Sequence, residues 1–184
     1  MLAIDRLALA TPGDVLPRPH DNCYWLLPGR MLAGEYPGRI DAEEQSRRLG
    51  AIIGAGVNCL IDLTGESEGL PPYVDALHVA AQGVAIQCQR FAIADYSVPQ
   101  AQTMRRILDA VDASLEAGDT IYLHCHGGIG RTGTVVGCWL VERGFTPTQA
   151  MALIADKWQV MTKRYRSPES PETPEQREFI AAWA

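Results

Sequence analysis

Residues 120–144 read TIYLHCHGGIGRTGTVVGCWLVERG, and they predict a strand, a glycine-rich loop and a helix in direct succession. The apolar run at 120–124 is typical of a buried strand, and apolar residues follow at helical spacing over 132–143. Gly144 is the expected end of that helix, because glycine readily adopts the left-handed conformation that closes many helices. A buried strand that leads through a short loop into a helix indicates an α/β domain.

Strands and helices alternate on both sides of this stretch. Strands are expected over residues 24–27, 31–33, 58–63 and 85–91. The first two are expected to form a hairpin, or two short strands, around Pro28-Gly29. Helices are expected over residues 41–55, 72–82 and 99–117, and two more begin at the N-caps Thr146 and Thr173. This alternation predicts a central, mostly parallel sheet flanked by helices.

The chain of 184 residues is long enough for one domain with a core of its own. Residues 1–22 are rich in proline and glycine, so they are predicted to form an irregular lead-in. Residues 23–184 are predicted to form a single domain, within which the charged, proline-rich segment 163–172 is a surface loop.

The composition is that of an ordinary globular protein, and it excludes several classes of partner. A formal net charge of −6 argues against nucleic acid or an acidic membrane as a bulk partner, so any anion site must be local. No apolar run approaches the roughly 18 residues needed to cross a bilayer. The N-terminus lacks a basic start followed by a continuous apolar stretch, so a cytoplasmic location is expected. The sequence does not indicate an oligomeric state.

The cysteines are odd in number and include no CxxC pair, which disfavours a disulfide framework and a zinc cage. They lie at positions 23, 59, 88, 125 and 138. We therefore expect reduced thiols. Cys59, Cys88 and Cys138 are expected to pack in the core.

The glycine-rich loop has the chemistry of an anion site. A loop between a strand and a helix N-terminus directs backbone N–H groups into one concavity, where the helix dipole adds positive charge. Arg131 supplies a planar guanidinium that can bind two phosphate oxygens. The residues expected to surround a phosphate are His126, Gly127, Gly128, Ile129, Gly130 and Arg131.

Cys125 lies at the start of this loop, where the same donors favour its thiolate over its thiol. A thiolate beneath a bound phosphorus atom is a nucleophile already in place. Thr132 can donate its hydroxyl to the sulfur and so make the thiolate a better leaving group. We expect His124 to fix the loop through a hydrogen bond to the backbone and not to act as a base.

The stretch HCHGGIGRTG resembles the active-site loop of the protein tyrosine phosphatase superfamily, His-Cys-x-x-Gly-x-Gly-Arg-Ser/Thr. All six specified positions match within the nine residues 124–132. The chain resembles the dual-specificity subgroup in its short length and in the position of the motif, two-thirds of the way along the sequence. The resemblance implies a phosphatase-like αβα domain that needs neither a metal nor another cofactor and works through a phosphocysteine on Cys125.

Members of that superfamily carry a general acid, an aspartate on a mobile loop about thirty residues before the nucleophile. Asp95 lies 30 residues before Cys125, after a predicted strand and before Pro99, which begins a predicted helix. The resemblance therefore implies that Asp95 protonates the leaving oxygen and then takes a proton from the water that cleaves the phosphocysteine. An ordinary helix cap is the alternative for this residue. Asp62 and Asp75 could serve instead, but neither has this loop setting.

Two further residues have competing interpretations. In some relatives a glutamine in a late loop positions the attacking water, and Gln176 in TPEQ is similar, although a helix capping box explains it equally. His126 beside Cys125 suggests a metal ligand, yet no other ligand is spaced along the sequence to complete a site. We expect no metal and no cofactor.

The sequence therefore predicts a hydrolase that dephosphorylates phosphotyrosine proteins, with phosphoserine and phosphothreonine proteins as further substrates. A phosphoinositide or inositol-phosphate phosphatase is the first alternative, since it would share this chemistry. Relatives of that kind often carry a lysine inside the loop, whereas the variable positions here are His126, Gly127 and Ile129. A non-catalytic phosphate-binding pseudophosphatase is the second alternative. A sulfur-transfer or arsenate-reducing enzyme also uses a Cys-loop-Arg but would not need Asp95.

Overall fold

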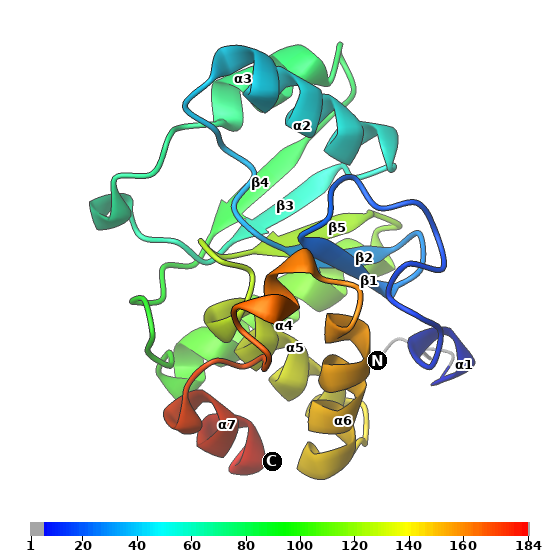
Figure 1. Cartoon of the computed structure of the whole chain (residues 1–184), viewed down its shortest axis with the longest axis vertical. Helices are drawn as coiled ribbons and strands as arrows, with labels where there is room; N and C mark the ends of the chain where they lie inside the picture. The colour runs from blue at the N-terminus through cyan, green and yellow to red at the C-terminus, as the bar shows by residue number, and fades with distance from the viewer. Residues whose placement is uncertain (1–5, 184) are drawn as a thin grey trace.

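The computed structural model describes residues 6–183, in which five strands form one sheet. The strands are β1 (Cys23–Leu27), β2 (Met31–Gly34), β3 (Cys59–Asp62), β4 (Gln87–Arg90) and β5 (Ile121–His124). Their order across the sheet is β1-β2-β5-β3-β4, and β1 alone runs antiparallel to its neighbour (Figure 1). The predicted α/β fold with a mostly parallel sheet is confirmed.

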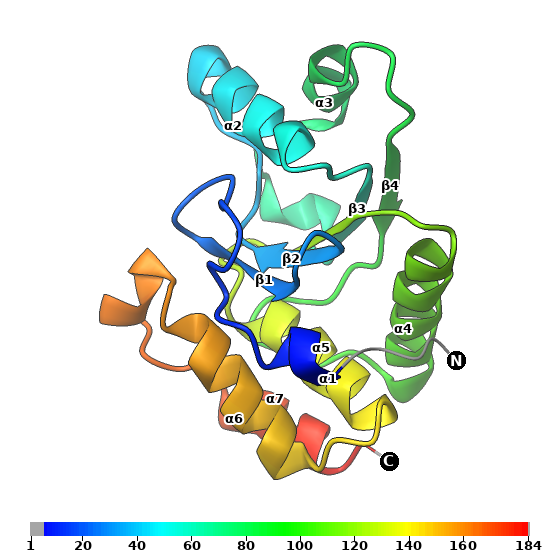
Figure 2. The same ribbon diagram turned by 90° about the vertical axis from the view of Figure 1, so that its right-hand side faces the viewer.

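Helices cover both faces of the sheet. They are α1 (Arg6–Leu9), α2 (Ala42–Gly54), α3 (Val74–Ala80), α4 (Ala101–Glu116), α5 (Gly130–Glu142), α6 (Pro147–Trp158) and α7 (Pro174–Ala181). Two 3₁₀ turns, η1 (Glu66–Glu68) and η2 (Thr162–Tyr165), interrupt the loops. Figures 1 and 2 show α2 and α3 on one side of the sheet and α4 to α7 on the other.

Alternating side chains of the central strand β5 supply the two halves of the core. Ile121 and Leu123 pack with residues of α4 to α7, whereas Tyr122 packs on the other face with residues of α2 and α3. This alternation follows from the period of two in a β-strand. Burial on both faces explains why β5 contains no aspartate, glutamate, lysine or arginine.

The carboxyl ends of the parallel strands lie side by side. His124 at the end of β5 is level with Gly34 of β2 and with Asp62 of β3. Loops that follow these three strands therefore start from one edge of the sheet. In open α/β folds this edge is where ligands bind.

Several helix ends follow the chemistry that the sequence predicts. The Asp41 side chain accepts from the backbone N–H of Glu44 at the start of α2, and Thr146 and Thr173 form complete capping boxes. Helix α5 begins at Gly130, two residues earlier than predicted, so its first turn is part of the glycine-rich loop. The helix expected over 72–82 is shorter, at Val74–Ala80.

The lead-in contains one short helix, α1, and is otherwise irregular from residue 10 to residue 22. It packs against the sheet, since the backbone N–H of Trp25 donates to Gly13 O over 2.8 Å and its indole N–H donates to Pro17 O over 3.2 Å. The described part of the lead-in is thus attached to β1. Residues 1–5 of the predicted lead-in lie outside the described residues.

The prediction that Cys88 packs in the core is wrong, because Cys88 is exposed on β4 at the edge of the sheet. That strand reads QCQR and has too few apolar side chains to be covered on either face. Cys59 and Cys138 are buried as expected. Among residues 6–183 no helix combines the length and apolar character that a membrane span requires.

Candidate active site

The loop from Cys125 to Gly130 joins β5 to α5 and curls against the end of β2. Gly128 has a φ of +72°, and a Cβ there would lie 2.6 Å from the backbone nitrogen of Glu35, so glycine is required. The backbone N–H of Tyr36 also donates to His126 O over 3.0 Å. These contacts hold the loop in one tight shape.

Cys125 lies at the floor of this loop and is only 2% exposed. The backbone N–H of Gly128 points at its sulfur, with a nitrogen-to-sulfur distance of 3.3 Å. Helix α5 starts five residues after Cys125, so its first N–H groups also belong to the loop. The structure thus places the Cys125 thiol next to one backbone N–H of the loop, and the predicted set of phosphate-binding N–H groups stays a prediction.

Arg131 is buried at the start of α5, and carboxylates hold it in place. Its Nη1 donates to Glu68 Oε1 over 2.6 Å and to Ile93 O over 3.0 Å. Its Nη2 donates to Glu68 Oε2 over 3.0 Å and lies 2.8 Å from Asp95 Oδ1. Its Nε is buried and has no hydrogen-bond partner within residues 6–183. The Nε–H is therefore a donor that an anion in the loop can satisfy.

The electrostatics keep this arginine charged. Burial alone lowers the pKa of Arg131, but the Glu68 hydrogen bonds and the nearby Cys125 and Asp95 raise it above its ordinary value overall. Burial likewise raises the pKa of Glu68, and its bond to Arg131 reverses this, so the net shift is downward. Arg131 and Glu68 are therefore both charged, and the two hydrogen bonds between them orient the guanidinium.

Sequence reasoning missed Glu68. The residue lies in η1 within the polar segment GESEG, where a glutamate resembles an ordinary solvated charge. Its carboxylate also accepts from the backbone N–H of Gly65 over 2.7 Å, which fixes the turn. The available signal was a short glycine-flanked turn directly after β3, at the edge of the sheet where ligands bind.

Asp95 lies in the loop after β4, and its side chain also contacts Arg131. A turn in which Ser97 donates to Ala94 O through its backbone N–H (3.2 Å) and its hydroxyl (2.8 Å) surrounds Asp95 and Tyr96. Tyr96 has a φ of +59°, an uncommon conformation for a residue other than glycine. The Asp95 side chain is 45% exposed and pairs with Arg131. The predicted position of this carboxylate beside the loop thus agrees with the structure.

The two alternative aspartates lie elsewhere. Asp62 is buried at the end of β3, where it accepts from Thr64 N over 2.8 Å and pairs with Arg90 at 3.0 Å. Asp75 is exposed on α3, the helix that packs beside α2. Neither contacts Arg131 within residues 6–183, so Asp95 is the better candidate for the acid.

His124 is fully buried beneath the loop. Its Nε2 hydrogen-bonds to the Tyr73 hydroxyl over 2.9 Å, and its Nδ1 lies 3.8 Å from Asp62 Oδ1. Burial lowers the pKa of His124 to about 4, although the Asp62 charge opposes the shift. The predicted hydrogen bond from His124 to the loop backbone is not made, because its Nδ1 has no hydrogen-bond partner among residues 6–183 and its Nε2 pairs with a side-chain hydroxyl. That His124 positions the loop stays a prediction.

Thr132 is fully buried in the first turn of α5, yet its hydroxyl has no hydrogen-bond partner within residues 6–183. The expected donation to the Cys125 sulfur is therefore not made in this structure. The role of Thr132 in catalysis stays a prediction.

Gln176 forms the predicted capping box and contacts the site as well. Its Oε1 accepts from the backbone N–H of Thr173 over 3.1 Å, and its Nε2 donates to Ser97 O over 3.2 Å. A Cβ on Gly130 would lie only 2.6 Å from Gln176 Oε1, so the amide packs directly on the loop. Gln176 thus connects the loop of Asp95 to the glycine-rich loop.

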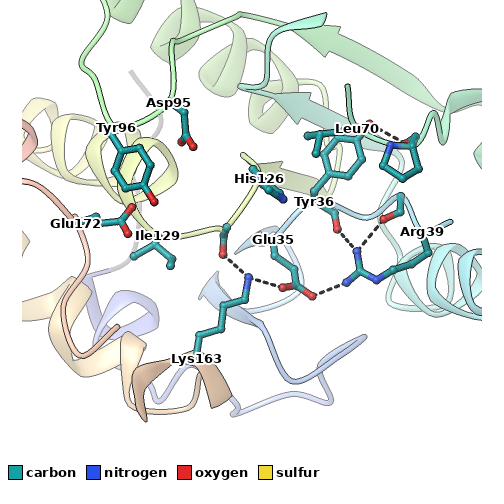
Figure 3. Close-up of a pocket in the computed structure, with 13 residues that line it drawn as sticks. Glu35, Tyr36, Arg39, Leu70, Asp95, Tyr96, His126, Ile129, Lys163 and Glu172 are labelled. Carbon is teal, nitrogen blue, oxygen red and sulfur yellow. Dashed lines mark hydrogen bonds and ion pairs between the residues drawn. The ribbon is translucent and has the colours of Figure 1, made fainter. Parts of the chain in front are cut away.

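A pocket of about 410 Å³ opens over the loop (Figure 3). Tyr36, Leu70, Tyr96 and Ile129 give it aromatic and aliphatic walls. Its charged lining residues are Glu35, Arg39, Asp95, Lys163 and Glu172. The pocket lining thus combines apolar and charged side chains, as in many small-molecule sites.

Glu35 forms a second ion-pair cluster beside the pocket. Its Oε1 pairs with Arg39 at 2.6 Å and with Arg48, and its Oε2 lies 2.5 Å from Lys163 Nζ. Burial alone raises the pKa of Glu35, but the three cations reverse this and lower it to about 2. Lys163 also donates to Gly127 O over 3.0 Å, which Figure 3 shows. Through Lys163, the Glu35 cluster is thus hydrogen-bonded to the glycine-rich loop.

One group of side chains could hold a metal ion. Glu68, Asp95 and His126 each offer a ligand atom, and these atoms lie within 4.8 Å of one another. The three residues come from segments that are far apart in the sequence, so their spacing along the chain did not predict this group. Both carboxylates already pair with Arg131, whose positive charge opposes a cation there. The donor set therefore fits a resident metal poorly.

Comparison with known proteins assigns the chain to a family. Residues 20–180 match the model of PTP-SAK, described as Swiss Army Knife protein, DSP-PTPase phosphatase domain. The chain belongs to this family. It is therefore a phosphatase of the protein tyrosine phosphatase superfamily, of the dual-specificity type, as the loop motif predicts.

Solved structures share the fold. Tk-PTP in its active form is 24% identical with a TM-score of 0.59, and the match covers 82% of this chain and 88% of that one. PTPMT1 in complex with PI(5)P is 19% identical with a TM-score of 0.63, covering 84% and 90%. The core catalytic domain of the PP-IP phosphatase SIW14 from S. cerevisiae is 14% identical with a TM-score of 0.57, covering 92% and 88%. At these identities the likeness concerns the fold.

Proposed function

We propose that this phosphatase hydrolyses phosphotyrosine in proteins, and phosphoserine or phosphothreonine as further substrates, through a phosphocysteine on Cys125. The observation that carries the proposal is the arrangement around the glycine-rich loop. The backbone N–H of Gly128 points at the Cys125 sulfur, and the buried Arg131, whose Nε has no hydrogen-bond partner among residues 6–183, lies near that thiol. A phosphate bound there presents its phosphorus to the sulfur while its outer oxygens accept from the loop and from Arg131.

In the first step the Cys125 thiolate attacks phosphorus, and the bond to the leaving oxygen breaks. Asp95 protonates that oxygen. Asp95 Oδ1 lies 2.8 Å from Nη2 of Arg131, so its carboxyl group is next to the guanidinium that would bind the phosphate.

In the second step water attacks the phosphorus of the phosphocysteine. The S–P bond breaks, its electron pair returns to Cys125 as thiolate, and the water loses a proton to a carboxylate in the pocket. Arg131 and the loop N–H groups bind the same phosphate oxygens in both steps. The Arg131–Glu68 ion pair supports this work because it keeps the guanidinium oriented between turnovers.

The pocket walls favour a phosphoprotein over a phosphoinositide. Tyr36, Tyr96 and Ile129 offer aromatic and aliphatic contacts to a tyrosine ring. The cations Arg39, Arg48 and Lys163 exceed the single negative charge of Glu35, and this excess is the feature that would suit an additional phosphate of a phosphoinositide. Phosphoinositide hydrolysis is the alternative, and PTPMT1, a relative in fold, has been solved with PI(5)P. A pseudophosphatase is disfavoured because the Cys125 thiol, Arg131 and Asp95 gather around one loop.

Two assays test the proposal. Cys125→Ser should abolish hydrolysis of an aryl phosphate, whereas Cys88→Ser, which removes an exposed thiol, should leave it unchanged. Near wild-type turnover by Cys125→Ser would reject the nucleophile. Phosphotyrosine peptides, phosphoserine peptides and phosphoinositides are then compared side by side. A kcat/KM highest for a phosphoinositide would reject the proposed substrate class and retain the chemistry.

A further inference from the structure

A second hollow, which we call the side groove, opens beside the active-site pocket. Its lining residues are Gly38, Arg39, Ile40, Asp41, Glu44 and Pro71. Gly38, Arg39 and Pro71 also line the pocket, so the two spaces meet at these residues. Figure 3 shows Arg39 on the opposite side of the pocket from Asp95 and Tyr96. A substrate in the pocket can therefore extend past Arg39 into the side groove.

Contacts within the fold hold the walls of the side groove in place. The Tyr36 hydroxyl donates to Pro71 O over 3.0 Å, which joins the segment after β2 to the loop before α3. Gly38 permits this close approach, because a Cβ there would collide with Pro71 O. The backbone N–H of Arg39 donates to Gln45 Oε1 of α2 over 2.8 Å. The fold itself thus shapes the side groove, without a substrate.

The charged residues of the side groove contact one another. Arg39 Nε donates to Glu44 Oε1 over 3.1 Å, and Asp41 Oδ1 accepts from the backbone N–H of Glu44 over 2.8 Å. Arg39 Nη2 also pairs with Glu35 at 2.6 Å. Positive and negative groups are thus paired, and no single sign of charge marks the side groove as a site for an ion.

Ile40 is an apolar side chain that the fold leaves uncovered. It is 94% exposed, more than any other large hydrophobic residue within residues 6–183. An apolar residue directly before an N-cap often packs on the fourth residue of the helix. In α2 the N-cap is Asp41 and the fourth residue is Gln45, whose polar side chain instead accepts from Arg39 N. Ile40 thus lacks this usual partner, and an apolar group that covers it gains free energy from the water released.

We propose that the side groove binds an apolar side chain of the substrate polypeptide, close in sequence to the phosphorylated residue, through Ile40 and Pro71. The inference rests on the proposed function, because it takes the substrate to be a phosphoprotein. The pocket holds the phosphorylated residue, and the side groove continues from it at Arg39. Successive residues of an extended chain lie about 3.3 Å apart, so a near neighbour of the phosphorylated residue reaches the adjoining groove. Ile40 is then a specificity-determining residue.

The test uses a set of polar phosphotyrosine peptides in which one leucine is moved, position by position, from the N-terminal to the C-terminal side of the phosphotyrosine. At one of these positions leucine should raise kcat/KM on the order of tenfold over the leucine-free peptide. The gain should appear as a lower KM, because a contact remote from the reacting atoms stabilises the bound substrate and the transition state alike. An aryl phosphate, which has no such side chain, serves as the reference substrate.

Ile40→Ser should remove this preference, so that the leucine peptide and the leucine-free peptide give the same kcat/KM. The exposed position spares the core, and an unchanged melting temperature checks that the fold is intact. Val79→Ser is the matched control, because Val79 is 79% exposed on α3 and lines neither the pocket nor the side groove. The control should keep the full preference for leucine.

Two results would overturn the inference and leave the proposed function in place. One is an equal kcat/KM of the wild type for all the peptides, and the other is a leucine preference that Ile40→Ser retains. Turnover of the aryl phosphate and of a phosphoinositide, without hydrolysis of any peptide, would instead overturn the proposed function and the inference with it.

Discussion

Two ion-pair clusters flank the pocket, and their compositions are opposite. Around Glu35 one carboxylate meets the three cations Arg39, Arg48 and Lys163, and both of its oxygens are paired. Around Arg131 one guanidinium meets the carboxylates of Glu68 and Asp95. In each cluster one arginine Nε, that of Arg48 or that of Arg131, is buried without a hydrogen-bond partner among residues 6–183. The central charge is negative in the first cluster and positive in the second, which lies near Cys125.

This difference suggests that the Glu35 cluster stabilises the fold and that the Arg131 cluster takes part in the reaction. A buried charge with all its partners contributes to the fold and loses much when one partner is removed. A buried guanidinium near the Cys125 thiol and the glycine-rich loop is instead placed to bind an anion. Variants of the Glu35 cluster should therefore reduce stability more than turnover, and variants of the Arg131 cluster should do the reverse.

The largest effect is expected for Arg131→Lys. A single ammonium cannot bind two phosphate oxygens, so kcat/KM should fall on the order of 10³–10⁵-fold, nearly as far as for Arg131→Ala. Steady-state hydrolysis of an aryl phosphate measures this. The control is Arg177→Lys, which alters an exposed pair with Glu169. Full activity of Arg131→Lys would mean that Arg131 supports the fold alone.

Asp95→Asn should follow, with a loss that depends on the leaving group. Turnover should fall roughly 10²–10⁴-fold for a phosphotyrosine peptide, whose oxygen needs a proton, and much less for an activated aryl phosphate. The alkaline limb of the pH–rate profile should also disappear, since it reports loss of the proton from the acid. Equal losses for both substrates would move the acid role to another residue, with Asp62 tested first.

Glu35→Gln tests the other cluster. Three cations would lose their shared partner, so the free energy of unfolding should fall by about 3–5 kcal/mol. Turnover of the folded fraction should change less than about tenfold, because Glu35 is absent from the proposed chemistry. Urea unfolding measures the first quantity. Glu43→Gln, in an exposed pair with Arg47, should stay within about 0.5 kcal/mol. A greater loss of turnover than of stability would contradict the comparison.

A smaller effect on stability is expected from the protonation of two histidines, His124 and His20. Burial lowers the pKa of His124 to about 4 and that of His20, beside Arg48, to about 3. The unfolded chain binds these protons first, so the stability is present above about pH 6.5 and is lost as the pH falls. Between pH 7 and pH 5 each histidine should remove up to about 2 kcal/mol.

Urea midpoints at both pH values measure this loss. His124→Asn and His20→Asn should each make the pH dependence shallower, whereas His78→Asn, on the exposed side of α3, should not. An unchanged slope in the first two variants would show that other groups cause the acid loss.

Sequence reasoning succeeded where the chemistry is local. Cys125 and Arg131 lie on one strand–loop–helix unit, so their spacing alone predicts their meeting, and Asp95 was found from its distance along the chain. Glu68 and Lys163 come from separate loops, and only the packed sheet edge brings them to the glycine-rich loop. Polar residues in such loops carry no periodic signal.

The account is tested most directly by acid quench of wild-type enzyme during turnover of an aryl phosphate, followed by peptide mapping. We predict phosphate on the peptide that contains Cys125, none on the peptide that contains Cys88, and no adduct at all in Cys125→Ser. Turnover without any phosphorylated cysteine, or phosphate on His126 instead, would contradict the proposed mechanism.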